Sequence, residues 1–109
     1  MEKIGRMYRS GIWKVRAGKI EEFISVWQTS VDWLIAQHPM GWVGEAVLLQ
    51  DIDNSHKFIS FAWSSMPGRT EEILSGIEYQ PFMVKMRQLC EEIQPHRMRV
   101  AAYAVSKNL

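Results

Sequence analysis

The stretch VRAGKIEEFISVW, residues 15–27, contains the change of hydrophobic period that decides the fold. Residues 7–15 mix β-branched and aromatic residues with polar ones, which predicts a strand that ends at the turn around Gly18. From Lys19 to about residue 37, apolar residues recur at helical spacing, and two glutamates lie in the first turn, where the helix dipole favours negative charge. A strand followed by an amphipathic helix is therefore expected here.

The rest of the chain adds turn signals and further periodic segments. The expected elements are strands at 43–50 and 58–64, a short helical turn at 70–74, a helix at 79–93 and a buried strand at 98–105. Thr70 is placed to cap the short turn, and Gly76 ends it. Pro95 ends the last helix because proline cannot continue it.

The order strand, helix, strand, strand, helix, strand predicts a ferredoxin-like α+β fold, βαββαβ. Right-handed crossovers place both helices on one face of a four-stranded antiparallel sheet. A chain of 109 residues fits a single domain, 1–109, with a core from about 7 to 105. The sheet is thus covered on one face only.

The uncovered face is expected to need a partner, because its residues do not form a clean polar set. The residues expected there are Ile12, Val43, Val47, Leu49, Ala62, Val100 and Ala102, beside Glu45 and Ser60. Two such sheets packed face to face would close a barrel with four helices outside. We therefore expect a homodimer through the open sheet face, a dimeric α+β barrel.

Composition excludes several classes of function. Hydrophobic residues make up 47% and charged residues 23%, which is ordinary for a globular protein and too apolar for disorder. A net charge of +1 gives no reason to expect nucleic-acid or membrane binding, and no segment approaches the length of about 18 apolar residues that spanning requires. A single cysteine, Cys90, forms no internal disulfide, so a reducing, cytoplasmic location is expected.

Two segments carry a resemblance to a known family. VRAGKIEEFISVW resembles the strand-to-helix turn of the antibiotic biosynthesis monooxygenase-like family, where a valine, a glycine-lysine turn, acidic residues and a phenylalanine recur in that order. LLQDIDNSHKFISFAWSS, residues 48–65, resembles its hairpin, which ends in a tryptophan, here Trp63. The resemblance covers about 7 to 105 and implies a dimeric α+β barrel. Some members oxidise aromatic polyketides or quinols with oxygen and without metal or flavin, and another branch degrades haem.

The sequence departs from the haem-degrading pattern. That branch combines an asparagine on the first strand, the tryptophan of the third strand and a histidine on the last helix. Here the first strand has Ser10 and Gly11, and residues 79–93 contain no histidine. Haem ligation by that pattern is not expected. The three histidines are scattered, so no metal site is expected. The resemblance to the branch that uses neither metal nor flavin implies that no cofactor is needed.

A candidate ligand pocket follows from the alternation in FISFAWSS, residues 58–65. Its large apolar residues, Ile59, Phe61 and Trp63, are expected to face the helices. The small residues between them, Ser60, Ala62 and Ser64, are expected to face the partner sheet. The expected pocket residues are Trp63, Phe61, Ile59, Trp13, Trp27, Tyr79, Phe82, Met83 and Met86. His38, after the first helix, is the candidate base, and Tyr79 and Arg87 are candidate donors to an oxyanion. The same residues at this spacing are also typical of a filled core.

Two functions remain open at this level. One is a cofactor-independent monooxygenase acting on a phenolic or quinol-like substrate, as the resemblance implies. The alternative is a non-catalytic binder of an apolar ligand, aromatic or fatty acyl, in a pocket between sheet and helices. A filled core with function only at the surface is a third interpretation. Trp33 and Val26, off the main helical stripe, indicate either a contact surface or isolated exposed residues.

Overall fold

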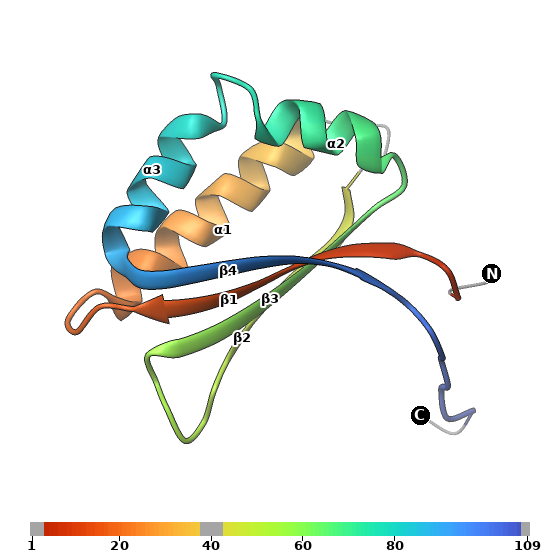
Figure 1. Cartoon of the computed structure of the whole chain (residues 1–109), viewed down its shortest axis with the longest axis horizontal. Coiled ribbons are helices and arrows are strands. Elements are labelled where there is room, and N and C mark those ends of the chain that lie inside the picture. Colours follow the sequence, from red (N-terminus) through yellow and green to blue (C-terminus); the bar gives the residue numbers. More distant parts are fainter. Residues whose placement is uncertain (1–3, 38–42, 108–109) are drawn as a thin grey trace.

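The computed structural model describes residues 4–37 and 43–107. In chain order its elements are β1 (Met7–Val15), α1 (Ile20–Gln37), β2 (Val43–Gln50), β3 (Lys57–Ser64), α2 (Pro67–Leu74), α3 (Gln80–Leu89) and β4 (Cys90–Arg99). The strands pair antiparallel in the order β2-β3-β1-β4. All three helices lie on one side of this sheet (Figure 1). The expected ferredoxin-like α+β fold is confirmed.

The amino-terminal half follows the local sequence signals closely. β1 ends at Val15, and Gly18 takes the left-handed φ of 75° that lets the chain turn directly into α1. The first turn of α1 carries Glu21 and Glu22 as expected. The helix buries Phe23 and Trp27 of its apolar stripe against the sheet.

The boundary between α3 and β4 differs from the expected one. The helix stops at Leu89, whose carbonyl accepts a hydrogen bond from the Arg16 N–H at 2.9 Å, and Cys90 is already extended. The expected helix to Ile93 was wrong because Leu89, Cys90 and Ile93 fit a helical stripe and a strand equally well over so short a run. In the structure, the residues from Cys90 onward pair with the free edge of β1, and this pairing makes them a strand.

Pro95 lies inside β4, opposite Gly11, and does not end a helix. β4 is an edge strand, where the missing N–H of proline is tolerated. The ladder continues to Val100, whose N–H donates to the Arg6 carbonyl at 2.9 Å. Residues 101–107 form no strand, so the expected buried strand at 98–105 was also wrong.

The short helix α2 begins at Pro67, earlier than the turn expected from Thr70. Proline is well suited to the first turn of a helix, because the backbone N–H that it lacks would have no intrahelical partner there. Thr70 is not a cap. It is buried inside the helix, with its hydroxyl 2.6 Å from the Ser64 hydroxyl at the end of β3.

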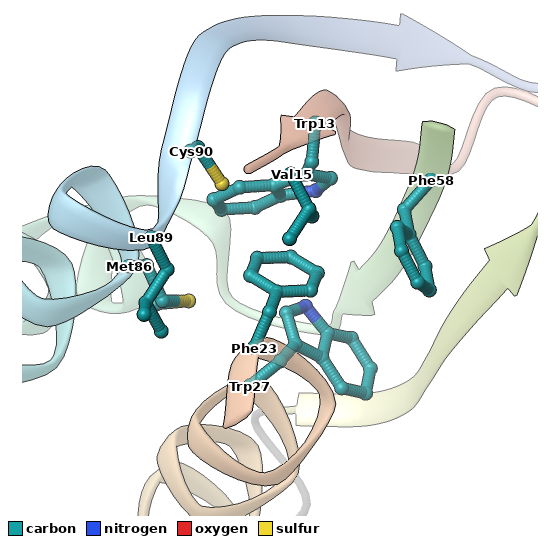
Figure 2. Close-up of a cluster of buried hydrophobic side chains, with 8 residues drawn as sticks. All are labelled: Trp13, Val15, Phe23, Trp27, Phe58, Met86, Leu89 and Cys90. Carbon is teal, nitrogen blue, oxygen red and sulfur yellow. The ribbon is translucent and has the colours of Figure 1, made fainter. Parts of the chain in front are cut away.

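The core lies between the sheet and the helices α1 and α3. Figure 2 shows its buried members, which are Trp13, Val15, Phe23, Trp27, Phe58, Met86, Leu89 and Cys90. The Phe23 ring is central, with its centroid 5.3 Å from that of Trp13 and 5.2 Å from that of Phe58. Tilted aromatic pairs at this separation are favourable beyond their buried area.

Strand register corrects the expected faces of β3. Phe58 lies opposite Trp13, and Ser60 opposite Gly11, so the small-residue row of β3 faces the helices together with Phe58. Ile59, Phe61 and Trp63 therefore face the open side. The bulky row was assigned to the helices because alternation alone does not tell which face is buried.

The side of the sheet away from the helices, called the open face below, is consequently more apolar than expected. Its apolar members, by register, are Tyr8, Ile12, Val47, Leu49, Ile59, Phe61, Trp63 and Met98. Leu49 is 51% exposed and Val47 38%. Ala62 and Ser60, expected on this face, lie on the other, and the side chain of Val43 is outside the described residues.

Within residues 4–37 and 43–107, no helix is long and apolar enough to cross a membrane.

Candidate functional site

A cavity of about 850 Å³ lies between the sheet and the helices. β1, β3 and β4 contribute to its wall, together with all three helices. Its apolar wall includes Trp13, Trp27, Val31, Leu34, Ala62 and Met83. A space of this size accommodates an aromatic molecule of several rings.

A cluster of polar side chains lines the same cavity where α2 meets β1 and β3. The guanidinium of Arg9 forms an ion pair with the carboxylate of Glu71. Beside it, Ser64 and Thr70 share a hydrogen bond between their hydroxyl groups. Arg87, Glu91 and Glu92 add charged residues from α3 and β4 to the lining. The cavity is thus more polar than the expected pocket residues, all of them apolar or aromatic, indicated.

Trp13 is held across the sheet on the cavity side. Its indole N–H donates a hydrogen bond to the Ser60 hydroxyl at 2.9 Å, and both residues are buried. Gly11 makes room for this contact, because a Cβ there would lie 2.8 Å from the indole nitrogen and 3.0 Å from the Ser60 oxygen. The flat ring therefore forms a fixed part of the cavity wall.

Tyr79 borders the cavity from the start of α3. Its ring forms a cluster with those of Trp33 and Phe82, at centroid distances of 6.2 and 5.6 Å. Burial raises the pKa of its hydroxyl, while a hydrogen bond with Ser30 and the charge of Arg9 act in the opposite direction. The hydroxyl is therefore protonated at neutral pH and lies within the field of Arg9.

The structure brings together only some of the expected pocket residues. Those that line the cavity are Trp13, Trp27, Trp63, Tyr79 and Met83, together with Arg87, the second candidate donor. Met86 is buried in the core, and Phe82 packs against Trp33 and Tyr79 without lining the cavity. Ile59 and Phe61 lie on the open face. His38 lies outside the described residues.

Trp63 occupies a border position at the end of β3. Register places it opposite Tyr8 in the row of the open face, and the Arg6 guanidinium lies 4.2 Å from its ring centroid. Gly44 lies directly against the ring, since a Cβ there would come within 1.9 Å of two ring carbons. Trp63 also contributes to the cavity lining. It is a wall shared by the cavity and the open face.

Trp33 does not form the exposed contact surface considered from the sequence. Its ring lies 5.7 Å from that of Phe82 and 6.2 Å from that of Tyr79, so α3 covers it. Val26 is half-buried and packs against the core cluster. The helical angle places both residues off the main stripe of α1, but it does not show which other elements pack against that side of the helix.

The described histidines have no catalytic arrangement. The His56 ring nitrogen Nδ1 lies 3.1 Å from the Val15 carbonyl, where it ties the hairpin to the end of β1. His96 lies opposite Ser10 on the open-face side of β4. In the described part of the chain, no group of three or more His, Cys, Asp or Glu residues is placed to hold a metal ion.

Sequence reasoning missed Arg9 and Glu71. They lie 62 positions apart and meet only because α2 packs over the end of the sheet. The sequence did contain one signal of this site. Arg9, Gly11 and Trp13 are alternate residues of β1, so their side chains lie on the same face of the sheet, the one that faces the helices. A charged residue in such a row is unusual and indicates either a partner or a solvent-filled site.

No protein-family model matches the sequence, and no curated protein sequence matches it. SnoaB, a cofactor-independent oxygenase from Streptomyces nogalater, matches with a TM-score of 0.76 at 16% identity, covering 94% of this chain and 98% of that one. A conserved protein from Methanosarcina mazei matches with a TM-score of 0.76 at 9% identity, over 89% and 94% of the chains.

A candidate antibiotic biosynthesis monooxygenase from Bordetella bronchiseptica matches with a TM-score of 0.70 at 12% identity, over 87% of this chain and 96% of that one. The resemblance to antibiotic biosynthesis monooxygenase-like proteins is therefore confirmed at the level of the fold. A shared fold at such low identity does not carry a reaction with it.

Proposed function

We propose that this protein binds a phenolic or quinol-like aromatic molecule in the cavity and oxidises it with molecular oxygen, without a metal or organic cofactor. The observation that carries the proposal is the composition of the cavity wall. Trp13 and Trp27 offer flat apolar surfaces, and the Arg9–Glu71 pair places a cation and a carboxylate in the same space. The structural neighbour SnoaB is described as a cofactor-independent oxygenase, which supports the class of reaction.

The reaction needs little from the protein. The substrate loses a proton and becomes an electron-rich anion, which passes one electron to oxygen. The resulting carbon radical and superoxide join through a new C–O bond, and the peroxide takes up a proton. Cleavage of the O–O bond then releases water and leaves a carbonyl group, so each atom of oxygen is accounted for. The protein binds the anion, accepts the proton and excludes bulk water.

The described side chains supply groups for these tasks. Glu71 is a carboxylate in the cavity wall that can accept a proton. Arg9 and Arg87 are cations in the same wall that favour an anionic substrate oxygen. The aromatic and aliphatic side chains of α1 keep the reacting region apart from bulk water.

The second candidate function is non-catalytic binding of an apolar ligand, aromatic or fatty acyl. It is favoured by the internal pairing of the polar wall: Arg9 with Glu71, Ser64 with Thr70, and Trp13 with Ser60. Groups that already satisfy one another are less available for chemistry. A co-purified lipid found by mass spectrometry of extracts of the protein would favour this function.

Oxygen uptake with a panel of quinols and phenols tests the first function. We expect turnover by the wild type and its loss in Ala62→Trp, which fills the cavity from β3. Ala36→Trp makes the same change on the exposed side of α1 and is expected to keep full turnover. Absence of oxygen uptake with every member of the panel would contradict oxygenation and leave binding as the function.

We also propose that the protein is a homodimer closed through the open face. The supporting observation is the apolar row of β3, with Ile59 and Phe61 beside Val47 and Leu49 of β2. A two-fold axis that lies between the two sheets and runs parallel to them would bury this surface against itself, so one patch serves both copies. The cavity lies on the opposite side of the sheet, which leaves it accessible in the dimer.

The cellular setting that we propose is reducing and cytoplasmic. Cys90 is the only cysteine and is buried, so the fold uses no disulfide within the chain. We expect the thermal midpoint to be unchanged by a thiol reductant.

A further inference from the structure

The Arg9–Glu71 pair differs from an ordinary surface ion pair in where it lies. Both residues line the cavity, Arg9 from β1 and Glu71 from α2. Their side chains are 41% and 45% exposed, so solvent reaches both groups. An ion pair with this exposure contributes little to folding and exchanges its partners readily. The guanidinium is therefore available to another anion.

The charges around Arg9 favour such an exchange. Arg97 of β4 lies opposite Arg9 in the sheet register, and both line a small pocket together with Glu71. Two guanidinium groups thus share the neighbourhood of one carboxylate. The hydroxyl of Tyr79, the residue just before α3, also lies within the field of Arg9 and is protonated at neutral pH. Arg87, Glu91 and Glu92 are the other charged residues of the cavity wall.

The apolar surroundings indicate what kind of anion fits. Arg9 lies two residues before Gly11 and four residues before Trp13, so the three residues are on the same face of β1, the one that faces the helices. The aromatic wall and the cation therefore lie along one strand, within one cavity. A free inorganic anion would make no apolar contact with the tryptophans, and a pure hydrocarbon would make no polar contact with the guanidinium.

We propose, on the basis that the cavity binds an aromatic molecule, that its occupant binds as an anion whose charged oxygen takes the place of Glu71 on the Arg9 guanidinium. The ring of the occupant then lies against Trp13. A guanidinium presents a planar fork of N–H donors, which suits a phenolate, enolate or carboxylate oxygen. Arg9 is thus the residue that determines the preference for an ionised ligand, and Glu71 is its competitor.

The experiment uses para-nitrophenol and its neutral methyl ether, para-nitroanisole, as matched probes. Absorbance reports the ionisation of the bound phenol directly, without any turnover. A neighbouring cation lowers the pKa of a phenol, so the wild type is expected to bind the phenolate about tenfold more tightly than the phenol. Para-nitroanisole cannot ionise, so its affinity reports how well the cavity binds the ring without a charged oxygen.

Three variants separate the roles of the charges. Arg9→Met is expected to remove the preference for phenolate and to keep the binding of para-nitroanisole. Arg9→Lys is expected to restore part of the preference. Glu71→Gln is expected to increase it, because the competing carboxylate is gone, an effect opposite to that of Arg9→Met. If the ion pair had only a structural role, Arg9→Met and Glu71→Gln would change the preference for phenolate in the same direction.

The matched control is the Arg69–Glu72 pair on the exposed side of α2, with an N–O distance of 3.3 Å. Neither residue lines the cavity, so Arg69→Met and Glu72→Gln are expected to leave both probes unaffected. Equal binding of phenol and phenolate by the wild type, or loss of the preference in Arg87→Met but not in Arg9→Met, would overturn this inference alone. Binding of neither probe would overturn the proposed function as well.

Discussion

Trp13 on β1 and Ser60 on β3 are joined by a buried hydrogen bond of 2.9 Å from the indole N–H to the hydroxyl oxygen. The bond links two neighbouring strands on the side of the sheet that faces the helices, beside the cavity. It fixes the orientation of an aromatic ring that otherwise has only packing to hold it. Both the stability of the sheet and the shape of the cavity depend on it.

Ser60→Ala is expected to destabilise the protein, because it leaves the buried indole N–H without its acceptor. The cost of such an unsatisfied donor is about 1–3 kcal/mol in the free energy of unfolding. Urea denaturation measures it. Ser25→Ala removes an exposed hydroxyl from α1 and serves as the control. Equal effects of the two substitutions would show that the Trp13–Ser60 bond does not stabilise the fold.

Gly11→Ala is expected to displace the Trp13 ring. The added Cβ would lie 2.8 Å from the indole nitrogen, closer than such contacts allow, and the cost of overpacking is about 1–3 kcal/mol. Gly68→Ala in α2 meets nothing within 4 Å and replaces a poor helix former, so it is expected to be neutral or stabilising. Thermal denaturation and tryptophan emission compare the two, and a neutral Gly11→Ala would contradict the close approach.

Phe61→Glu tests the proposed dimer, since it places a carboxylate in the middle strand pair of the open face. Burying an unpaired charge from each copy is expected to weaken association by about a hundredfold or more. Sedimentation at several protein concentrations measures the change. Ile52→Glu puts the same charge on the fully exposed hairpin loop and is expected to leave association unaltered. A wild-type protein that sediments as a monomer at micromolar concentration would rule the dimer out.

Cys90 links stability to alkaline pH. Burial raises the pKa of its thiol to about 11 from an ordinary value of 9.0, with the nearby Arg16 acting in the opposite direction. Between these values the unfolded chain has lost the thiol proton and the folded chain keeps it, so stability falls as pH rises through this range. The loss is about 3 kcal/mol for a shift of this size.

Cys90→Ala removes this dependence, apart from the separate contribution of Tyr79, whose pKa is also raised. Denaturation of the wild type and of Cys90→Ala at a series of pH values from neutral to alkaline measures the difference in slope. We expect the curves of the two proteins to converge as pH rises. Parallel curves would show that the thiol does not titrate differently in the folded and unfolded states.

The expected elements were accurate where the signals are local. The strand at 7–15, the helix to Gln37 and the hairpin from Val43 to Ser64 each combine a clear period with a turn signal. The segment 89–94 carries no such combination. Its apolar residues are too few to distinguish a helix from a strand, and the choice depends on the backbone groups that β1 offers at its edge.

The candidate site was predictable only in part, for the same reason. Trp13, Trp27 and Met83 were found because they belong to long apolar patterns. Arg9 and Glu71 were not, because no sequence pattern relates two residues that meet through the packing of α2 on the sheet. The two faces of β3 were exchanged because alternation defines two rows without saying which row the helices cover.

The sequence by itself determined the types and order of the elements, and with them the ferredoxin-like fold, because period and turn chemistry act over a few residues. The tertiary structure decided which row of β3 is buried, where β4 begins and which charges share the cavity. Each of these depends on hydrogen bonds and contacts between segments distant in the chain, such as Trp13 with Ser60 and Arg9 with Glu71. The free energy of such contacts exists only once the strands have paired and the helices have packed.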